Sequence, residues 1–255
     1  MRVERIGKAT LYCGDCLDIL PEVPAFGHVV TDPPYMLKSS SDHKSKLNPW
    51  NDLCNGAVFV SQWLKLCADR MENGGALWSF CNWRGLPAFM KGGYMAGLDM
   101  KSLLVWDKGY PGPGHYLRSR YELIAFYTVG GYRIADRNAP DIREEKWPAI
   151  KPHGHPAEKP EKLVDWLLSL SGADESVCDP FMGSGTVGVS ALKAGRGFIG
   201  IEADEHWFDV ACRRIEEAAR EITDTAIPRL RHPNLRKGSR DNKKPLVMRG
   251  KGEYR

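Results

Sequence analysis

A carboxylate, two prolines and an aromatic ring follow one another at Asp32, Pro33, Pro34 and Tyr35, directly after the apolar run Gly27–Thr31. Proline fixes its own φ angle, lacks an N–H and pushes the residue before it to an extended conformation. The four residues therefore predict a stiff segment that suits a planar amino group. This group would donate to Asp32 and to the Pro33 carbonyl, while Tyr35 stacks on the attached ring. A Pro-Pro turn after a strand, without chemistry, is the alternative.

The second pattern with chemical meaning is VCDPFMGSGTVGVSALKAGRGFIGIE, from Val177 to Glu202. An apolar run ends at Asp179, a turn contains Gly183 and Gly185, and small residues then begin a helix that leads to a second apolar run. Glycines let a ligand approach the backbone, and the first N–H groups of a helix have no partner within it. An acid at the end of the next strand can accept hydrogen bonds from both hydroxyls of a ribose, so the stretch predicts an adenosine-type ligand.

The chemistry of this turn narrows the class of ligand. No GKS or GKT follows either glycine, which excludes a phosphate loop, and the GxGxxG spacing of dinucleotide-binding folds is missing. Asp179 would repel phosphates. S-adenosylmethionine (AdoMet) carries an ammonium and a sulfonium group and no phosphate, so electrostatics favour AdoMet over NAD or ATP. A tight turn in an ordinary α/β domain is the alternative for the glycine pattern taken alone.

A third pattern, HPAEKPEKLVDWLL from His155, makes the set specific. With DPPY first and DPFMGSGT last, residues 9–215 resemble the β group of amino-methylating DNA methyltransferases. The resemblance implies that AdoMet is the methyl donor, double-stranded DNA the substrate and the N6 amino group of a flipped adenine the acceptor. The N4 amino group of cytosine is an alternative, although the cytosine enzymes more often have Ser where this chain has Asp32. A non-catalytic DNA-binding protein on a methyltransferase fold is another.

The resemblance also assigns roles to individual residues. Asp32, Pro33, Pro34 and Tyr35 would be the catalytic residues. A Gly-Asp pair contacts the adenine ring of AdoMet in this family, so Asp15 is a candidate acceptor. A helix N-cap is the alternative role, and both can hold together. The expected cofactor-binding residues are Asp15, Cys16, His155, Lys159, Pro160, Asp179, Phe181, Gly183, Ser184, Gly185, Thr186 and Glu202.

Alternating strand and helix patterns predict an α/β fold. We expect a doubly wound, seven-stranded mixed sheet of the AdoMet-dependent methyltransferase type, circularly permuted. Helical spacing predicts a helix over Val58–Met71 that ends at Asn73-Gly74-Gly75, and Pro160 is expected in the first turn of another helix. The expected strands are 10–13, 27–31, 76–80, 102–106, 121–129, 177–179 and a last one that ends at residue 202.

The predicted topology has two spatial consequences. Asp32 and Asp179 should follow adjacent central strands, because ligands of open α/β sheets bind where the strand order reverses. A permuted chain that opens between the strand ending at Glu202 and the strand ending at Cys13 should also bring Thr10 and Glu221 to the same side of the domain.

Charge is distributed unevenly along the 255 residues. Residues 1–227, the expected methyltransferase domain, are mildly acidic, whereas 228–255 contain ten Lys or Arg and two Asp or Glu. This tail has almost no apolar residues and is expected to be disordered. It could hold DNA phosphates without reading sequence, or it could be a solvated terminus without a role.

Cysteine usage and hydropathy limit the remaining classes. Seven scattered cysteines fit reduced thiols in a cytoplasm. The resemblance, together with the short chain and minimal recognition region, implies a bacterial or phage-encoded protein. Cys13 and Cys16 form a CxxC pair without the second pair that a zinc site needs, so no metal is expected. The sequence has no run of eighteen apolar residues, so we expect no membrane-spanning helix.

The resembled family places its target-recognition region between residues 130 and 154, and here this region is shorter than is usual. Basic residues in this region and in the loops 38–51 and 107–120 could reach base edges or phosphates, and solvated loops are the alternative. A homodimer is expected from resemblance only. The DNA-binding candidates are Lys38, Lys44, Lys46, Arg118, Arg120, Arg133, Arg137, Arg143 and Lys146.

Overall fold

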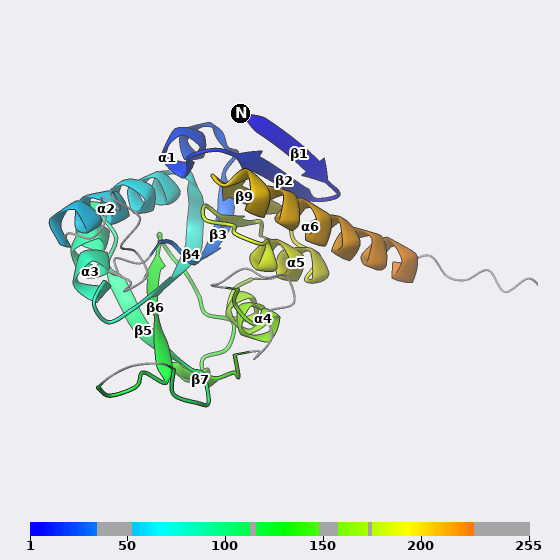
Figure 1. Ribbon diagram of the computed structural model, residues 1–255. Helices are drawn as coiled ribbons and strands as arrows, with labels where there is room; N and C mark the ends of the chain where they lie inside the picture. The colour runs from blue at the N-terminus through cyan, green and yellow to red at the C-terminus, as the bar shows by residue number, and fades with distance from the viewer. Residues whose placement is uncertain (35–52, 113–115, 148–157, 173–174, 227–255) are drawn as a thin grey trace, which may run out of the picture.

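One mixed sheet of nine strands runs through the described residues, which are 1–34, 53–112, 116–147, 158–172 and 175–226 of the computed structural model (Figure 1). The strand order across the sheet is β1-β2-β9-β8-β3-β4-β6-β5-β7. The strands are β1 (Arg2–Ile6), β2 (Ala9–Cys13), β3 (Phe26–Thr31), β4 (Met71–Cys81), β5 (Met100–Asp107), β6 (Tyr121–Thr128), β7 (Ile142–Glu144), β8 (Val177–Asp179) and β9 (Phe198–Glu202).

Helices cover both faces of this sheet, with α1, α2 and α3 on one side and α4, α5 and α6 on the other (Figure 1). Side chains of β4 alternate between the two layers: Trp78 and Phe80 face the α4–α6 side, and Leu77 and Cys81 face the other. The helical segments are α1 (Cys16–Ile19), the 3-10 turn η1 (Leu20–Glu22), α2 (Leu53–Arg70), α3 (Leu86–Met95), α4 (Glu161–Ser169), α5 (Thr186–Lys193) and α6 (Glu205–Ala226).

The centre of the sheet is parallel. Strand β8 pairs with β3 through His28 and Val177, and with β9 through Val177 and Phe198. Because these strands run in the same direction, the residues that follow their carboxyl ends meet at one edge of the sheet. The expectation that Asp32 and Asp179 follow adjacent central strands is confirmed.

All seven expected strands are present, and two more extend the sheet. Strand β1 forms an antiparallel hairpin with β2, and β7 adds a short parallel strand beside β5. Arg2–Ile6 reads RVERI, in which charged residues interrupt the apolar pattern that would announce a buried strand. Strand β7 lies inside the segment expected to recognise DNA and is only three residues long.

The segment Asn73-Gly74-Gly75 does not end a helix, as the sequence suggested, but lies within β4. Helix α2 stops at Arg70, and β4 begins at the next residue. The pairing of β3 with β4 shifts register between Phe26 and His28, and a Cβ on Gly75 would lie 2.5 Å from the Gly27 carbonyl oxygen. Glycine is therefore required by close backbone approach rather than by a helix cap.

Helix α4 begins one residue later than expected. Pro160 has φ −61° and ψ 130°, so it is the extended residue that precedes the helix, and Glu161 is the first helical residue. Its fixed φ angle is compatible with either position, and helix ends are defined only to within about one or two residues.

The β1–β2 hairpin lies against α6. A Cβ on Gly7 would be 3.8 Å from the Cβ of Ala219, and Arg2 forms an ion pair of 2.7 Å with Asp209. The β1–β2 hairpin and the part of α6 near Glu221 therefore lie on the same side of the domain, as predicted for Thr10. The circular permutation is defined relative to the strand order of other methyltransferases, and it stays a prediction.

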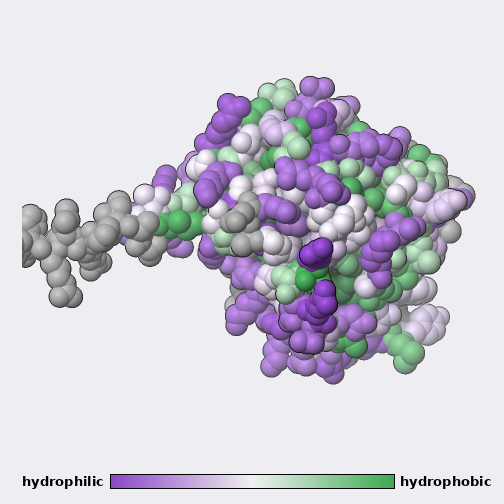
Figure 2. All heavy atoms as spheres, turned by 180° about the vertical axis from the view of Figure 1, so that it is seen from behind, coloured by the Kyte–Doolittle hydropathy of each residue, from purple (hydrophilic) through white to green (hydrophobic). Residues whose placement is uncertain are grey.

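No helix in the described ranges is long and apolar enough to cross a membrane. From behind, the surface is largely hydrophilic, with apolar side chains scattered across it (Figure 2). Of the two cysteines of the CxxC pair, Cys16 is buried and Cys13 is half-buried.

Replacing Gly188 by Ala should destabilise the fold. The added Cβ would lie 2.6 Å from Ile215 and 2.7 Å from Phe198, where α5, α6 and β9 pack. Overpacking costs about 1–3 kcal/mol, which exceeds the roughly 0.5–1 kcal/mol that alanine gains in a helix. Thermal unfolding should show a midpoint lower by about 2–4 °C for each kcal/mol lost. The control is Gly131→Ala, which meets nothing within 4 Å, and an equal shift in both variants would refute the packing argument.

Candidate active site

Three acidic side chains converge at the carboxyl edge of the parallel strands. Asp32 directly follows β3, and Asp179 and Glu202 are the last residues of β8 and β9. They line one cavity of about 490 Å³. Its other lining residues are Gly14, Asp15, Cys16, Thr31, Pro33, Pro34, Phe59, Phe80, Glu158, Lys159, Val164, Pro180, Phe181, Met182, Gly183, Ser184, Thr186, Val187, Ile201 and Ala203.

The turn between β8 and α5 requires both of its glycines. Gly183 has φ +53° and Gly185 has φ +84°, a left-handed conformation that costs other residues free energy. A Cβ on Gly185 would also lie 3.0 Å from Ala211 of α6. Helix α5 therefore starts close to α6, with its first turn at the cavity.

Arg214 of α6 holds this turn in place, and sequence reasoning missed it. Its Nη1 donates to the carbonyl of Ser184 at 2.8 Å, to the hydroxyl of Ser184 at 3.0 Å and to the hydroxyl of Thr186 at 3.2 Å. Its Nη2 lies 3.4 Å from the buried carboxylate of Glu158. Burial lowers the pKa of this guanidinium, which the neighbouring carboxylates oppose. The arginine sits inside an otherwise apolar face of α6, and spacing alone gives no signal for its role.

Glu202 is fixed by the backbone on both sides. The N–H of Gly183 donates to Oε2 at 2.8 Å, and the N–H of Asp204 donates to Oε1 at 2.9 Å. Burial raises the pKa of this carboxyl, which the two backbone donors oppose. Because each carboxylate oxygen can accept more than one hydrogen bond, the group can still receive two hydroxyls of a ligand.

Asp179 is fully buried and connects the two motif strands. The hydroxyl of Thr31 donates to its Oδ1 at 2.7 Å, and the N–H of Phe181 donates to the same oxygen at 3.1 Å. Burial raises the pKa of Asp179 to about 7, since the two donors only partly compensate for lost hydration. A ligand cation at this position would favour the charged form.

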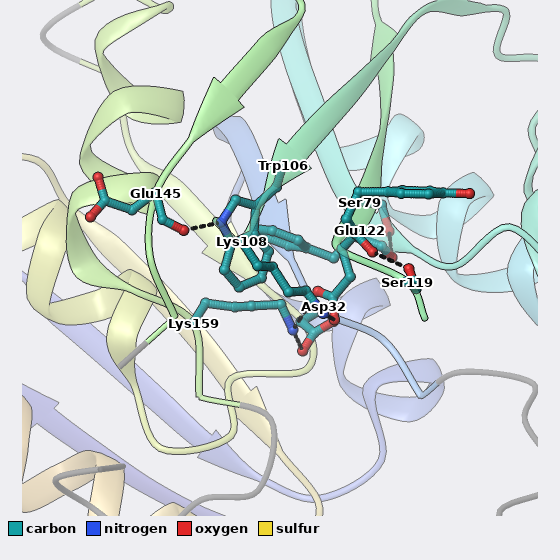
Figure 3. Close-up of polar contacts among 10 residues, drawn as sticks. Asp32, Ser79, Trp106, Lys108, Ser119, Glu122, Glu145 and Lys159 are labelled. Atoms are coloured by element: carbon teal, nitrogen blue, oxygen red, sulfur yellow. Dashed lines mark hydrogen bonds and ion pairs between the residues drawn. The ribbon is translucent and has the colours of Figure 1, made fainter. Parts of the chain in front are cut away.

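Asp32 forms an ion pair with Lys159, which lies 127 residues away in sequence just before α4 (Figure 3). The ammonium of Lys159 also lies 4.9 Å from the centre of the Phe80 ring. Lys159 was expected near the cofactor and Asp32 near the amino group of the substrate. Their contact shows that the two ends of the cavity are continuous.

Asp15 caps α1, because its carboxylate accepts the N–H of Leu17 at 2.9 Å. It also lines the cavity, so the cap is compatible with a contact to a ligand. Cys16 lines the cavity too, and burial raises the pKa of its thiol well above the ordinary value. Its side chain is therefore neutral and acts as a small apolar group.

The predicted site residues are largely brought together by the fold. Pro160 and Gly185 do not line the cavity; Pro160 precedes α4, and Gly185 begins α5. The residues that lie outside the described ranges are Tyr35, Lys38, Lys44, Lys46 and His155.

The described DNA-binding candidates occupy different environments. Arg120 forms a two-point ion pair with Asp107, Arg118 donates to the carbonyl of Gly112 at 2.6 Å, and Arg143 packs over Trp166 at 5.7 Å. Arg118 and Arg120 are exposed despite these contacts, and Arg143 is half-buried. Arg133, Arg137 and Lys146 are exposed on the surface.

The lining of the cavity indicates which ligand fits. Among the described lining residues, five are acidic and one, Lys159, is basic, a balance that disfavours phosphate. Phe59, Val164 and Ile201 offer apolar surface for a planar ring, and Glu202 offers acceptors for hydroxyls. A nucleoside with positive charge and without phosphate fits this arrangement.

Asp179→Asn should make the free energy of unfolding less dependent on pH. The folded pKa of Asp179 is about 7, above the unfolded value of about 3.9, so the folded state binds the extra proton between these values. This stabilising contribution is complete below about pH 4 and is lost as the pH rises through 7. Denaturant unfolding at pH 5 and pH 8 should show the Asn variant gaining stability relative to the wild type at pH 8. A constant difference between the two proteins would contradict the assignment.

Known proteins resemble the chain in sequence and in fold. A family model described as DNA methylase, N6_N4_Mtase, matches residues 26–213. YubD of Escherichia coli (strain K12) is 27% identical over 220 residues, which cover 84% of this chain and 92% of YubD. The type II methyltransferase M.HinfI of Haemophilus influenzae is 26% identical over 247 residues, which cover 82% of this chain and 68% of M.HinfI.

Two solved structures share the fold. The M1.HpyAVI–SAM complex superimposes with a TM-score of 0.64 at 23% identity, over 81% of this chain and 98% of the other. The PvuII DNA methyltransferase, described as cytosine-N4-specific, superimposes with a TM-score of 0.68 at 16% identity, over 86% and 92%.

Proposed function

The chain belongs to the N6/N4 family of DNA methylases, and we propose that it transfers a methyl group from AdoMet to the N6 amino group of adenine in double-stranded DNA. The observation that carries the proposal is the shared cavity. Asp32, the expected acceptor of the amino group, and Glu202, the expected acceptor of a ribose, line the same space of about 490 Å³.

The cofactor end of the site fits AdoMet on chemical grounds. Glu202 is positioned for the ribose hydroxyls, Asp179 for positive charge, and the turn at Gly183 for close approach. When bound, AdoMet supplies a methyl group on a positively charged sulfur, which is already a good electrophile. The chain's own task at this end is to orient that charge and to exclude water with Phe59, Phe80 and Val164.

At the other end, the residues after β3 must position a weak nucleophile. The lone pair of an adenine amino group is delocalised into the ring, so holding the nitrogen in line provides most of the rate acceleration. Asp32 and the Pro33 carbonyl accept hydrogen bonds from the amino group and favour a tetrahedral nitrogen. The proton leaves after transfer, so Asp32 does not have to be a strong base. Tyr35 is proposed to stack on the base.

The target base cannot be reached inside a duplex and has to flip out of the stack. The hairpin between β5 and β6 rises at the same edge of the sheet as the cavity, because β6 begins where β4 ends. Backbone hydrogen bonds from Lys108 to Arg120 and from Gly112 to Ser119 continue the hairpin beyond the sheet. We propose that DNA lies against this hairpin.

The identity of the base is the finer part of the proposal. Asp32 at the first position of DPPY favours adenine, and cytosine N4 is the alternative because the same family modifies both amino groups. A non-catalytic DNA-binding role is the remaining alternative. A homodimer, a place in restriction–modification and a bacterial cytoplasm are proposed with the enzyme and rest on resemblance.

Modification sequencing of DNA from a methylation-free bacterial host that expresses the chain tests the function. N6-methyladenine within one short motif would support the proposal and give the recognition sequence. N4-methylcytosine would replace adenine by cytosine. DNA without modification, from a host in which the folded protein binds AdoMet, would favour the non-catalytic alternative.

Asp32→Asn and Glu202→Gln should separate catalysis from cofactor binding. Replacing the charged acceptor by a neutral amide with one acceptor oxygen should lower methyl incorporation about 10²–10³-fold in the Asp32 variant, with AdoMet affinity nearly unchanged. Glu202→Gln should weaken AdoMet about 10–100-fold in calorimetric titration, because hydrogen bonds to a charged group contribute about 1.5–3 kcal/mol. Asp99→Asn, an exposed carboxylate, is the control. Parallel loss of both properties in both variants would contradict this division.

Leu117→Ala should impair methylation of duplex DNA more than of denatured DNA. Leu117 is 100% exposed and its neighbour Tyr116 is 96% exposed at the hairpin, where apolar side chains could enter a base step. Denatured DNA is already unstacked and does not need this help. The KM for duplex DNA should rise about tenfold, equivalent to about 1.4 kcal/mol. Ile222→Ala, an exposed apolar residue of α6, is the control, and an equal effect on both forms of DNA would exclude the hairpin from unstacking.

A further inference from the structure

Four charged side chains from four different parts of the fold form a continuous chain at the cavity. Lys108 follows β5, Glu122 belongs to β6, Lys159 precedes α4 and Asp32 follows β3 (Figure 3). The Nζ of Lys108 lies 2.8 Å from Oε1 of Glu122, and the Nζ of Lys159 lies 3.7 Å from Oε2 of the same carboxylate. Lys159 also pairs with Asp32. Positive and negative groups therefore alternate from Lys108 to the catalytic carboxylate.

These groups are held in a poorly hydrated place. The side chains of Lys108 and Glu122 are each 12% exposed, that of Lys159 is 6% exposed and that of Asp32 is 20% exposed. Removing charges from water is costly, and well-packed apolar residues are often as stable. A contribution to the stability of the fold is therefore a weak explanation for these two positive and two negative charges beside the reaction site. A role in the reaction explains them better.

Lys108 is itself positioned by aromatic rings. Its ammonium lies 4.4 Å from the centre of the Trp147 ring and 5.3 Å from that of Trp106. The indole N–H of Trp106 donates to the Glu145 carbonyl at 2.7 Å, which fixes the ring. Lys108 is thus fixed in position, and its ion pair with Glu122 fixes that carboxylate.

We propose that Glu122 is a positioning residue that keeps the ammonium of Lys159 in place when Asp32 accepts the amino group of the target base. The inference rests on the proposed methyl transfer. Lys159 lies between two carboxylates, so it can shift its main partner from Asp32 to Glu122 without moving far or leaving a buried charge unbalanced. Asp32 then accepts from the base, and Lys159 still keeps the cofactor end of the cavity in order.

Neutralising Glu122 has a specific consequence under this proposal. Asp32 would become the only carboxylate of the four, so Lys159 would hold it more firmly and the base would have to displace a stronger partner. The loss would fall on the chemical step, because Glu122 acts on the site through Lys159, which pairs with Asp32.

The test compares Glu122→Gln, Glu122→Asp and the control Glu144→Gln, an exposed glutamate of β7. Methyl incorporation from AdoMet into DNA of a methylation-free bacterium gives kcat and both KM values. Glu122→Gln should lower kcat about 10²-fold, with both KM values changed less than about threefold, as for a small misplacement of a reacting group. Glu122→Asp should recover part of kcat, and the control should match the wild type.

The variant Glu122→Gln/Lys108→Met separates catalysis from folding. It removes one charge of each sign, so the protein should regain any stability that Glu122→Gln alone loses. Its kcat should stay low, because Lys159 still has Asp32 as its only carboxylate among the four. Recovery of the wild-type kcat would overturn the proposal, since Glu122 would then only neutralise Lys108.

Two other results would also overturn the inference. One is a kcat for Glu122→Gln within about twofold of the wild type, which is below the effect of a misplaced group. The other is a raised KM for AdoMet with kcat unchanged, which would make Glu122 part of cofactor binding. An inactive wild type would instead refute the proposed function, so the two failures are distinguishable.

Discussion

The hydrogen bond from Thr31 to Asp179 joins two segments that are 148 residues apart in sequence, and the site exists because β3 and β8 run parallel beside each other. A shift of one residue between these strands would turn every side chain to the opposite face and separate the acids at their ends. Burial of β3 and β8 on both faces, in two apolar layers, makes such a shift costly. Catalytic geometry is thus a property of sheet register, and the loops around the cavity depend on it.

Concentrating acids at one edge requires compensation, and the fold provides it in three ways. Backbone N–H groups approach Glu202 and Asp179, a buried arginine joins Glu158 to the turn, and Lys159 pairs with Asp32. Each device leaves the cavity more acidic than basic while avoiding isolated buried charges. A cationic ligand without phosphate fits this balance of charges, to which several residues contribute.

Most of the fold and much of the site could be predicted from sequence, because local rules and global structure agree there. Asp32 and Glu202 can be recognised because each is an acid at the end of an apolar run. Gly183 and Gly185 can be recognised as glycines of a turn. Arg214 and Glu122 were not predicted, since their partners lie far away in sequence and their own surroundings look like an ordinary helix and strand. Gly75 was misread for the same reason: the Gly27 backbone that requires a glycine there belongs to another strand.

Both edge strands of the sheet have features that disfavour pairing with strands of other copies of the protein. Strand β1 carries charges at Arg2, Glu4 and Arg5, and β7 is only three residues long. Short or charged edge strands resist the addition of further strands from other molecules. Edge-to-edge aggregation is therefore disfavoured at both edges of the described sheet, and so is the addition of a second copy through these strands.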